Sequence, residues 1–131
     1  MALLFLYGTL MRGFRNAAQL DLGHFLGPVR TAREECSMVA CVDPPYPFPG
    51  VIAGHSHIAG ELYDAGTDLL RRLDAFELEG QEYMRETIAL NNGESAQYYR
   101  LIYPSRITVV DQHAQIDFNK SENCYRWVHV E

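Results

Sequence analysis

The chain has 131 residues, of which 47% are hydrophobic, and its 11 basic and 17 acidic side chains give a formal net charge of −6. This length is typical of one compact domain whose core needs no disulfide or metal, and the apolar content excludes a disordered chain. The acidic balance leaves no basic stripe for a phosphate backbone, so we expect no nucleic acid as a partner. We therefore predict a single domain over residues 1–131.

The cysteines and the first residues indicate the compartment. Three cysteines, Cys36, Cys41 and Cys124, are an odd number in a chain that needs no covalent support, which favours free thiols in a reducing cytoplasm. The apolar start Ala2–Tyr7 lacks the basic region and the cleavage site of a signal peptide. No apolar run reaches the roughly 18 residues that a membrane span requires. We expect a cytoplasmic protein with no membrane partner, and the sequence does not indicate an oligomeric state.

The first half of the chain indicates short strands separated by loops. Ala2–Tyr7 is a continuous apolar run that ends at a glycine, which is typical of a buried strand, and two glycines bracket a loop over 8–13. A helix is predicted over 16–26 and a strand over 37–42. Four prolines within 43–50 exclude a helix or a central strand and favour a surface loop or an edge.

The second half indicates one clear helix among further strands. Thr67 is predicted as the N-cap of a helix that runs to about Phe76, with Asp68 in its first turn. The other expected elements are strands at 51–54, 58–63, 84–90 and 96–103, turns at 64–66 and 91–93, and edges at 107–110 and 125–130. Many short strands with one helix predict an α+β domain, with a small curved or barrel-like sheet and helical insertions.

A carboxylate follows this helix on its apolar side. The apolar residues share one face of the helical wheel: Leu69, Leu70, Leu73 and Phe76. If the helix continues by one residue, Glu77 falls between Leu70 and Leu73. Burial penalises the charged form of such a carboxyl group and raises its pKa, which is typical of a general acid or base beside a cavity. The alternative is a residue at the helix end that reaches solvent or pairs with Arg85.

The end of the first strand is the second candidate. The segment Tyr7-Gly8-Thr9-Leu10 can expose successive backbone N–H groups without side-chain obstruction, and such groups can hold a carboxylate or a developing oxyanion. The alternative is an ordinary strand exit. Gly8 and Gly13 have the spacing of a phosphate loop, but Phe14-Arg15 stands where Lys-Ser/Thr is required, which excludes a nucleotide site.

Two other patterns are weaker. Gly54–Ile58 approaches the Gly-x-Ser-x-Gly nucleophile elbow around Ser56, but isoleucine replaces the second glycine and the chain is short for a hydrolase sheet. His55 and His57 share a strand face without a third ligand nearby, and the spacing of Cys36 and Cys41 does not match a zinc knuckle. A serine hydrolase therefore stays a minor alternative, and we expect no metal.

Five short motifs follow one another along residues 3 to 105: Phe5–Gly13, Tyr46-Pro47, Gly60–Tyr63, Leu73–Glu77 and Tyr83-x-Arg85. In series they resemble the gamma-glutamylcyclotransferase-like family, and most closely its gamma-glutamylamine cyclotransferase branch. The resemblance implies a small β-barrel flanked by helices, with mixed or antiparallel strands. It also implies a reaction without metal or cofactor, in which the α-amine of a γ-glutamyl compound attacks its own γ-carbonyl. The products are 5-oxoproline and a free amine or amino acid.

The resemblance also assigns residues. Glu77 corresponds to the catalytic glutamate, and Tyr7, Gly8, Thr9 and Leu10 correspond to the substrate loop. Glu77 is suited to deprotonate the α-ammonium group and then to protonate the leaving amine. Tyr83 and Arg85 are expected to hold the loop that follows Glu77.

Two alternatives stay open. Many relatives have glycine directly after the catalytic glutamate, whereas this chain has Glu77-Leu78-Glu79-Gly80, so an alignment on Glu-Gly would select Glu79. We prefer Glu77 because two motif spacings and the apolar face of the helix agree on it. The second alternative is a non-catalytic module that binds a small carboxylated metabolite in the same place.

Overall fold

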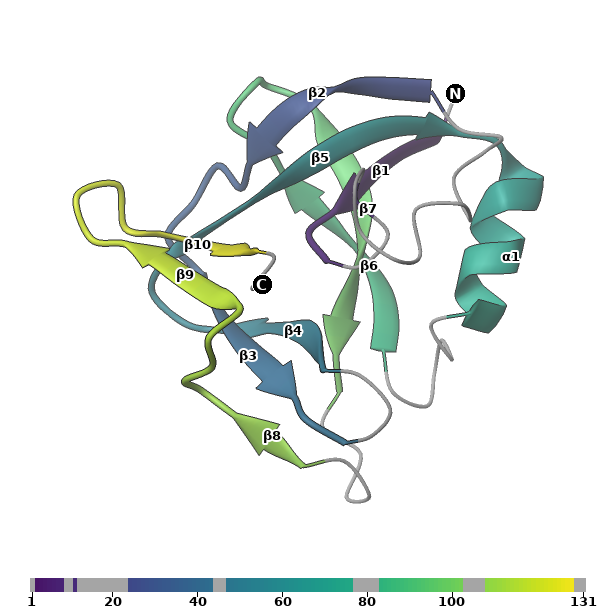
Figure 1. Cartoon of the computed structure of the whole chain (residues 1–131). Coiled ribbons are helices and arrows are strands. Elements are labelled where there is room, and N and C mark those ends of the chain that lie inside the picture. Colours follow the sequence, from purple (N-terminus) through teal and green to yellow (C-terminus); the bar gives the residue numbers. More distant parts are fainter. Residues whose placement is uncertain are drawn as a thin grey trace.

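The computed structural model describes residues 2–8, 11, 24–43, 47–76, 83–102 and 108–128. Within these residues the chain is an α+β domain with one helix and two sheets, which confirms the predicted fold class (Figure 1). The elements are β1 (Ala2–Leu6), β2 (His24–Arg30), β3 (Cys36–Cys41), β4 (Phe48–Ala53), β5 (His57–Ala65), α1 (Thr67–Phe76), β6 (Tyr83–Ala89), β7 (Ser95–Leu101), β8 (Val109–Val110), β9 (Ile116–Asn119) and β10 (Cys124–Trp127).

The larger sheet is built around β1 and β5. Its order is β6-β7-β1-β5-β10-β9, with β2 also paired to β5, and the smaller sheet has the order β4-β3-β8. β1 is antiparallel to β5 and parallel to β7, so the apolar run at its centre has strands on both sides. A Cβ atom at Gly60 would collide with the carbonyl of Leu6, and this strand pair therefore requires a glycine there.

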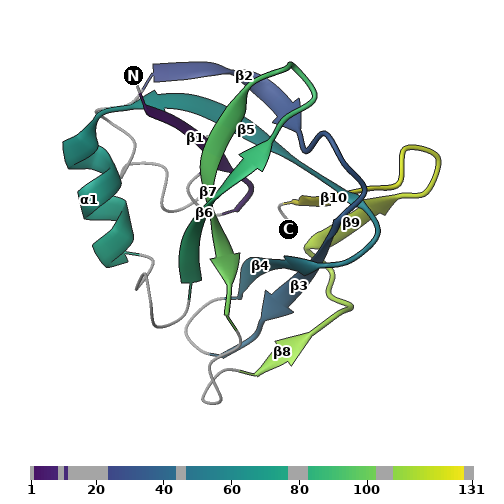
Figure 2. The same ribbon diagram turned by 180° about the vertical axis from the view of Figure 1, so that it is seen from behind.

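The described strands do not close into a barrel. After β2, the chain meets the end of β6 only at one bridge, Thr31↔Leu90, with backbone hydrogen bonds from Ala32 N to Ala89 O and from Asn91 N to Arg30 O. The ladder ends there because the chain then turns away to β3 in the smaller sheet. The barrel-like curvature is present, but the expected barrel is open at this point (Figure 2).

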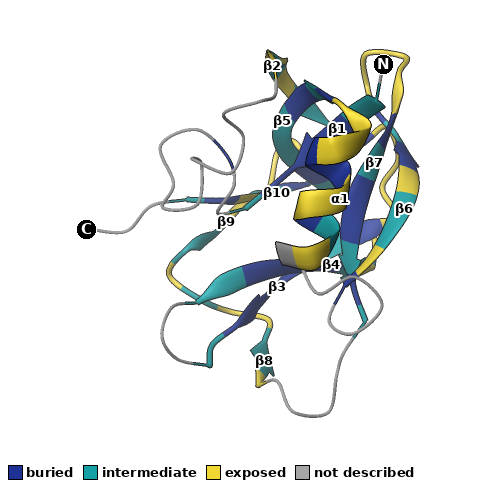
Figure 3. Cartoon of the chain, turned by 90° about the vertical axis from the view of Figure 1, so that its right-hand side faces the viewer, coloured by how far each residue is buried: buried dark blue, intermediate teal, exposed yellow. Residues whose placement is uncertain are grey.

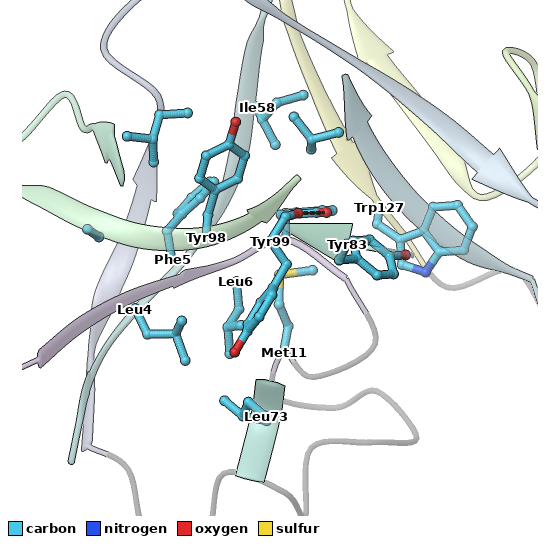
Figure 4. Close-up of a cluster of buried hydrophobic side chains, with 14 of the residues drawn as sticks. Leu4, Phe5, Leu6, Met11, Ile58, Leu73, Tyr83, Tyr98, Tyr99 and Trp127 are labelled. Atoms are coloured by element: carbon cyan, nitrogen blue, oxygen red, sulfur yellow. Dashed lines mark hydrogen bonds between the residues drawn. The ribbon is translucent and has the colours of Figure 1, made fainter. Parts of the chain in front are cut away.

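α1 packs its predicted apolar face on the larger sheet. Leu69, Leu70 and Leu73 are buried, whereas Arg71 and Arg72 are exposed, which confirms the expected orientation for these residues (Figure 3). Leu73 lies on the same side of the buried cluster as Met11 and the Tyr99 ring (Figure 4). The Phe76 side chain and Glu77 lie outside the described residues.

The helix begins one residue earlier in its hydrogen bonding than predicted. Leu70 N–H donates to the carbonyl of Gly66, so Gly66 is the N-cap and Thr67 is the first helical residue. The prediction of Thr67 as N-cap is therefore wrong by one position. The turn expected at 64–66 is also shorter, because β5 continues through Ala65.

Other local predictions differ from the structure at the edges. The helix expected over 16–26 is wrong at its end, because β2 begins at His24 with alternating exposure, and residues 16–23 lie outside the described part. Within the proline-rich segment, Phe48–Gly50 begins β4, an edge strand that tolerates the missing N–H of Pro49. β9 was not expected. None of the helices in the described ranges is long and apolar enough to cross a membrane.

Candidate active site

The exit of β1 is fixed by a tyrosine and a glycine. The buried Tyr7 donates its hydroxyl proton to the backbone carbonyl of Tyr99 on β7 at 2.5 Å. A Cβ atom at Gly8 would lie 2.6 Å from Cγ of Pro49, so only glycine lets the chain leave β1 alongside that ring. Met11 N–H donates to the Gly8 carbonyl at 3.0 Å. Thr9 and Leu10, which this hydrogen bond spans, lie outside the described residues.

Pro49 also contacts the start of β6. The buried Tyr83 donates its hydroxyl proton to the Pro49 carbonyl at 2.8 Å, and its ring centroid lies 6.3 Å from that of Phe48. Pro49 therefore touches Gly8 with its ring and binds Tyr83 with its carbonyl. The exit of β1 and the start of β6 therefore both contact the same residue of β4.

A second set of contacts joins the last turn of α1 to the larger sheet. The carboxylate of Asp74 lies 2.9 Å from Nε of Arg85 and accepts a hydrogen bond from Nη2 at 3.1 Å, so the pair is bidentate. The Tyr99 hydroxyl donates to Oδ1 of Asp74 at 2.7 Å. Arg85 and Tyr99 reach the same carboxylate because they are directly opposite each other in the β6–β7 ladder. About a quarter of the Asp74 side chain is exposed (24%).

Tyr99 belongs to both sets of contacts. Its carbonyl accepts the hydrogen bond from Tyr7, and its hydroxyl donates to Asp74. The strand exit at Gly8 and the helix end before Glu77 are therefore attached to one residue of β7.

Sequence reasoning singled out Tyr7, Gly8, Tyr83 and Arg85, and the structure brings these four around Pro49 and Tyr99. Glu77 and Glu79 lie outside the described residues, as do Thr9 and Leu10. Sequence reasoning did not assign a role to Pro49, Asp74 or Tyr99. Asp74 sits inside the Leu73–Glu77 motif, and a charge partner at Arg85 was the signal that could have identified it.

The other ionisable groups with shifted pKa values are poor candidates for chemistry. Burial raises the pKa of the Cys36 thiol to about 11, so this cysteine stays protonated and unreactive near neutral pH. Burial, followed by the nearby Cys36, raises the pKa of Tyr98 to about 12. All three cysteines are buried thiols that form no disulfide with another described residue.

The alternative nucleophile and metal patterns do not assemble among the described residues. The Ser56 hydroxyl donates to Oδ1 of Asn123 at 2.7 Å, and Nδ1 of His57 lies 2.9 Å from the Thr31 carbonyl. Ser56 is thus not bonded to an imidazole base. In the part of the chain that the structure describes, no three His, Cys, Asp or Glu side chains group as metal ligands.

Comparison with known proteins shows the family of this chain. Residues 4–126 match the model of the family described as "Gamma-glutamyl cyclotransferase, AIG2-like". The chain belongs to this family. The resemblance found in the motifs is confirmed at this level, and the family supports a cyclotransferase enzyme that acts on a small molecule.

Two relatives carry the name "putative gamma-glutamylcyclotransferase". The one from Vibrio cholerae is 36% identical over 86 residues, which cover 66% of this chain and 70% of the relative. The one from Methanocaldococcus jannaschii is 30% identical over 109 residues, which cover 79% of this chain and 86% of the relative.

Solved structures share the fold. The structure of an AIG2-like protein from Mus musculus has a TM-score of 0.63 and 26% identity, and the match covers 88% of this chain and 89% of that one. An allophanate hydrolase of Kluyveromyces lactis has a TM-score of 0.71 and 19% identity over 85% of this chain. This chain spans only 19% of that hydrolase, so the likeness shows the fold alone.

Proposed function

We propose that this protein is a cofactor-independent cyclotransferase that converts a γ-glutamyl amine or γ-glutamyl amino acid into 5-oxoproline and the free amine. Glu77 is the general base and then the general acid, and the segment Tyr7–Leu10 binds the substrate. Family membership supports the reaction class. The three buried cysteines form no disulfide among the described residues, which supports a reducing compartment, the cytoplasm.

The observation that carries the proposal is the double attachment at Tyr99. Tyr7 binds its carbonyl and Asp74 binds its hydroxyl, while Pro49 touches Gly8 and binds Tyr83. The described residues on either side of Glu77, and the residues next to Thr9 and Leu10, are therefore held close together. A general base and a row of main-chain N–H groups can act on the same substrate molecule only if the segments that carry them lie close together.

The contacts of Asp74 support Glu77 as the base. Both oxygens of Asp74 are engaged, one by Arg85 and the other by Tyr99 and Arg85. Because donors from the larger sheet occupy both oxygens, this carboxylate holds the end of α1 against the sheet. Asp74 is therefore a positioning residue, and Arg85 acts through it.

The reaction is an intramolecular aminolysis. Glu77 takes a proton from the α-ammonium group, and the amine nitrogen then forms a bond with the γ-carbonyl carbon. Backbone N–H groups of the segment Gly8–Leu10 bind the substrate carboxylate or the oxyanion. Glu77 returns the proton to the leaving nitrogen as the bond between this nitrogen and the carbon breaks, and the ring nitrogen passes its remaining extra proton to the released amine. Since the nucleophile is tethered, the main task is to hold a folded conformer, which can contribute about 7–11 kcal/mol.

The test is the formation of 5-oxoproline by the purified chain from γ-glutamyl amines and γ-glutamyl dipeptides. We expect Glu77→Gln to lower kcat by about 10²- to 10⁴-fold, because it removes a general base. Glu79→Gln is the matched control and should keep the wild-type rate. The opposite pattern would assign the reaction to Glu79. Binding of these compounds without any product would support a non-catalytic binding module instead.

A further inference from the structure

The only tryptophan of the chain, Trp127, carries a buried donor without a partner. The residue ends β10 and is 2% exposed, and its indole Nε1–H makes no hydrogen bond to any residue in the described part of the chain. The indole nitrogen can only donate. A buried donor of this kind is rare in native proteins, because leaving it unpaired is costly. A bound ligand that carries a hydrogen-bond acceptor would satisfy this donor.

The indole lies on the side of the buried cluster where Tyr83 is found. Figure 4 shows its ring beside the ring of Tyr83, with the indole nitrogen on the edge that is turned toward Tyr83. Tyr83 in turn binds the carbonyl of Pro49, whose ring touches Gly8. Trp127 follows the last residue matched by the family model, so family likeness does not assign it a role.

We propose that Trp127 is a ligand-binding residue of this site, whose indole N–H donates a hydrogen bond to an amide carbonyl oxygen of the ligand. The proposal rests on the proposed function and deepens it. In a γ-glutamyl substrate the acceptor is the γ-carbonyl oxygen, and in 5-oxoproline it is the same oxygen in the lactam ring. No covalent step involves the indole.

The charges around the indole favour a neutral acceptor. Trp127 is part of the buried hydrophobic cluster, where a carboxylate would need a cation. The two arginines of β6 and β7 are already paired, Arg85 with Asp74 at 2.9 Å and Arg100 with Glu86 at 2.8 Å. His113 stacks on the face of the indole, with ring centroids 5.9 Å apart and planes inclined by 14°, so it does not face the N–H edge.

The single tryptophan makes a direct test possible on the wild-type chain. In a ¹⁵N-labelled sample it gives one indole N–H resonance, which can be followed during titration with 5-oxoproline, 2-pyrrolidinone and glutarate. We expect 5-oxoproline and 2-pyrrolidinone, which have a lactam carbonyl, to move this resonance downfield. Glutarate, which has only carboxylates, should leave it in place. An indole resonance unmoved by 5-oxoproline, or moved by glutarate alone, would overturn the proposal.

A pair of variants gives the second measurement. Trp127→Phe keeps an aromatic ring but removes the donor, and it should raise the Kd of 5-oxoproline by about 5- to 10-fold, as expected for one neutral hydrogen bond. Tyr125→Phe on the same strand is the control, because its ring packs 4.6 Å from Phe118 and should not affect binding. Equal Kd values for Trp127→Phe and wild type would contradict the proposal.

The two proposals can fail separately. If the wild-type chain forms 5-oxoproline while its indole resonance stays unmoved by that product, the role of Trp127 is wrong and the reaction stands. If no γ-glutamyl compound is turned over but 5-oxoproline moves the resonance, the site binds the lactam and the reaction is wrong. Thermal unfolding of both variants checks that each is folded before its Kd is compared.

Discussion

Removing the hydroxyl of Tyr99 tests whether the end of α1 is held by the larger sheet. In Tyr99→Phe the ring remains, the carbonyl still accepts the hydrogen bond from Tyr7, and only the 2.7 Å bond to Asp74 is lost. A hydrogen bond to a charged group contributes about 1.5–3 kcal/mol. Asp74 keeps its pair with Arg85 and is 24% exposed, so water replaces part of the lost bond. We therefore expect the lower end of that range, about 1.5 kcal/mol.

Urea unfolding at equilibrium measures this loss as a lower midpoint with an unchanged slope. For a domain of this size the same loss lowers Tm by roughly 3–6 °C. The kcat for 5-oxoproline formation should fall while KM changes less, because the hydroxyl positions the helix end before Glu77 and does not bind substrate. A loss of folded protein would also lower the apparent kcat at unchanged KM, so kcat is compared per folded molecule, at a temperature well below the Tm of the variant.

A double-mutant cycle with Asp74→Ala isolates the contact. In the Asp74→Ala background the hydroxyl of Tyr99 has lost its acceptor, so Tyr99→Phe should then cost almost nothing in the free energy of unfolding. The reasoning is refuted if Tyr99→Phe costs the same in both backgrounds, since its effect would then come from elsewhere in the core.

Three further predictions use the same measurements. Gly8→Ala should lower the free energy of unfolding by about 1–3 kcal/mol, because its Cβ would lie 2.6 Å from Pro49, and an unchanged urea midpoint would contradict this contact. Arg85→Lys keeps the charge but loses the planar fork on Asp74, so kcat should fall, whereas a wild-type kcat would show that the fork is not needed. Stability should fall as the pH rises from about 9 to 11, because the unfolded chain loses the Cys36 proton near 9 while the folded chain holds it to a pKa of about 11. Cys36→Ala should remove that part of the alkaline loss, and urea midpoints at pH 8 and pH 10.5 compare the two proteins.

The elements that could be predicted from the sequence are those that local patterns specify. α1 and its apolar face follow from the spacing of Leu69, Leu70 and Leu73, and the β6–β7 hairpin follows from alternation around the turn at 91–93. β2 could not be found in this way. Its residues alternate in exposure, but the exposed ones are His24, Leu26 and Pro28, so no alternation of apolar and polar residues marks this edge strand in the sequence. Whether the sheet closes depends on how strands that are distant in the sequence pair with each other. Among the described residues, the chain after β2 meets the end of β6 only at the bridge between Thr31 and Leu90, so the sheet stays open.

The candidate site, too, could be predicted from the sequence only in part. The motifs indicated Tyr7, Gly8, Tyr83 and Arg85, but the residues that join them come from elsewhere in the fold. The β6–β7 hairpin places Tyr99 opposite Arg85, but both meet Asp74 only because the last turn of α1 packs against this hairpin, and that packing is a tertiary property. The unpaired indole of Trp127 is likewise visible only in the folded chain, because its sequence neighbours carry no motif.

Three tyrosines explain how so small a domain can hold a precise site. Tyr7, Tyr83 and Tyr99 each bury an aromatic ring in the core and place one hydroxyl on a defined acceptor, two of them carbonyls and one a carboxylate. Each ring is fixed by packing, and so the position of each hydroxyl is fixed with it. An intramolecular ring closure gains its rate from a fixed substrate conformation, and mobile walls would forfeit that gain. The proposed chemistry therefore requires fixed contacts of the kind that these three tyrosines make.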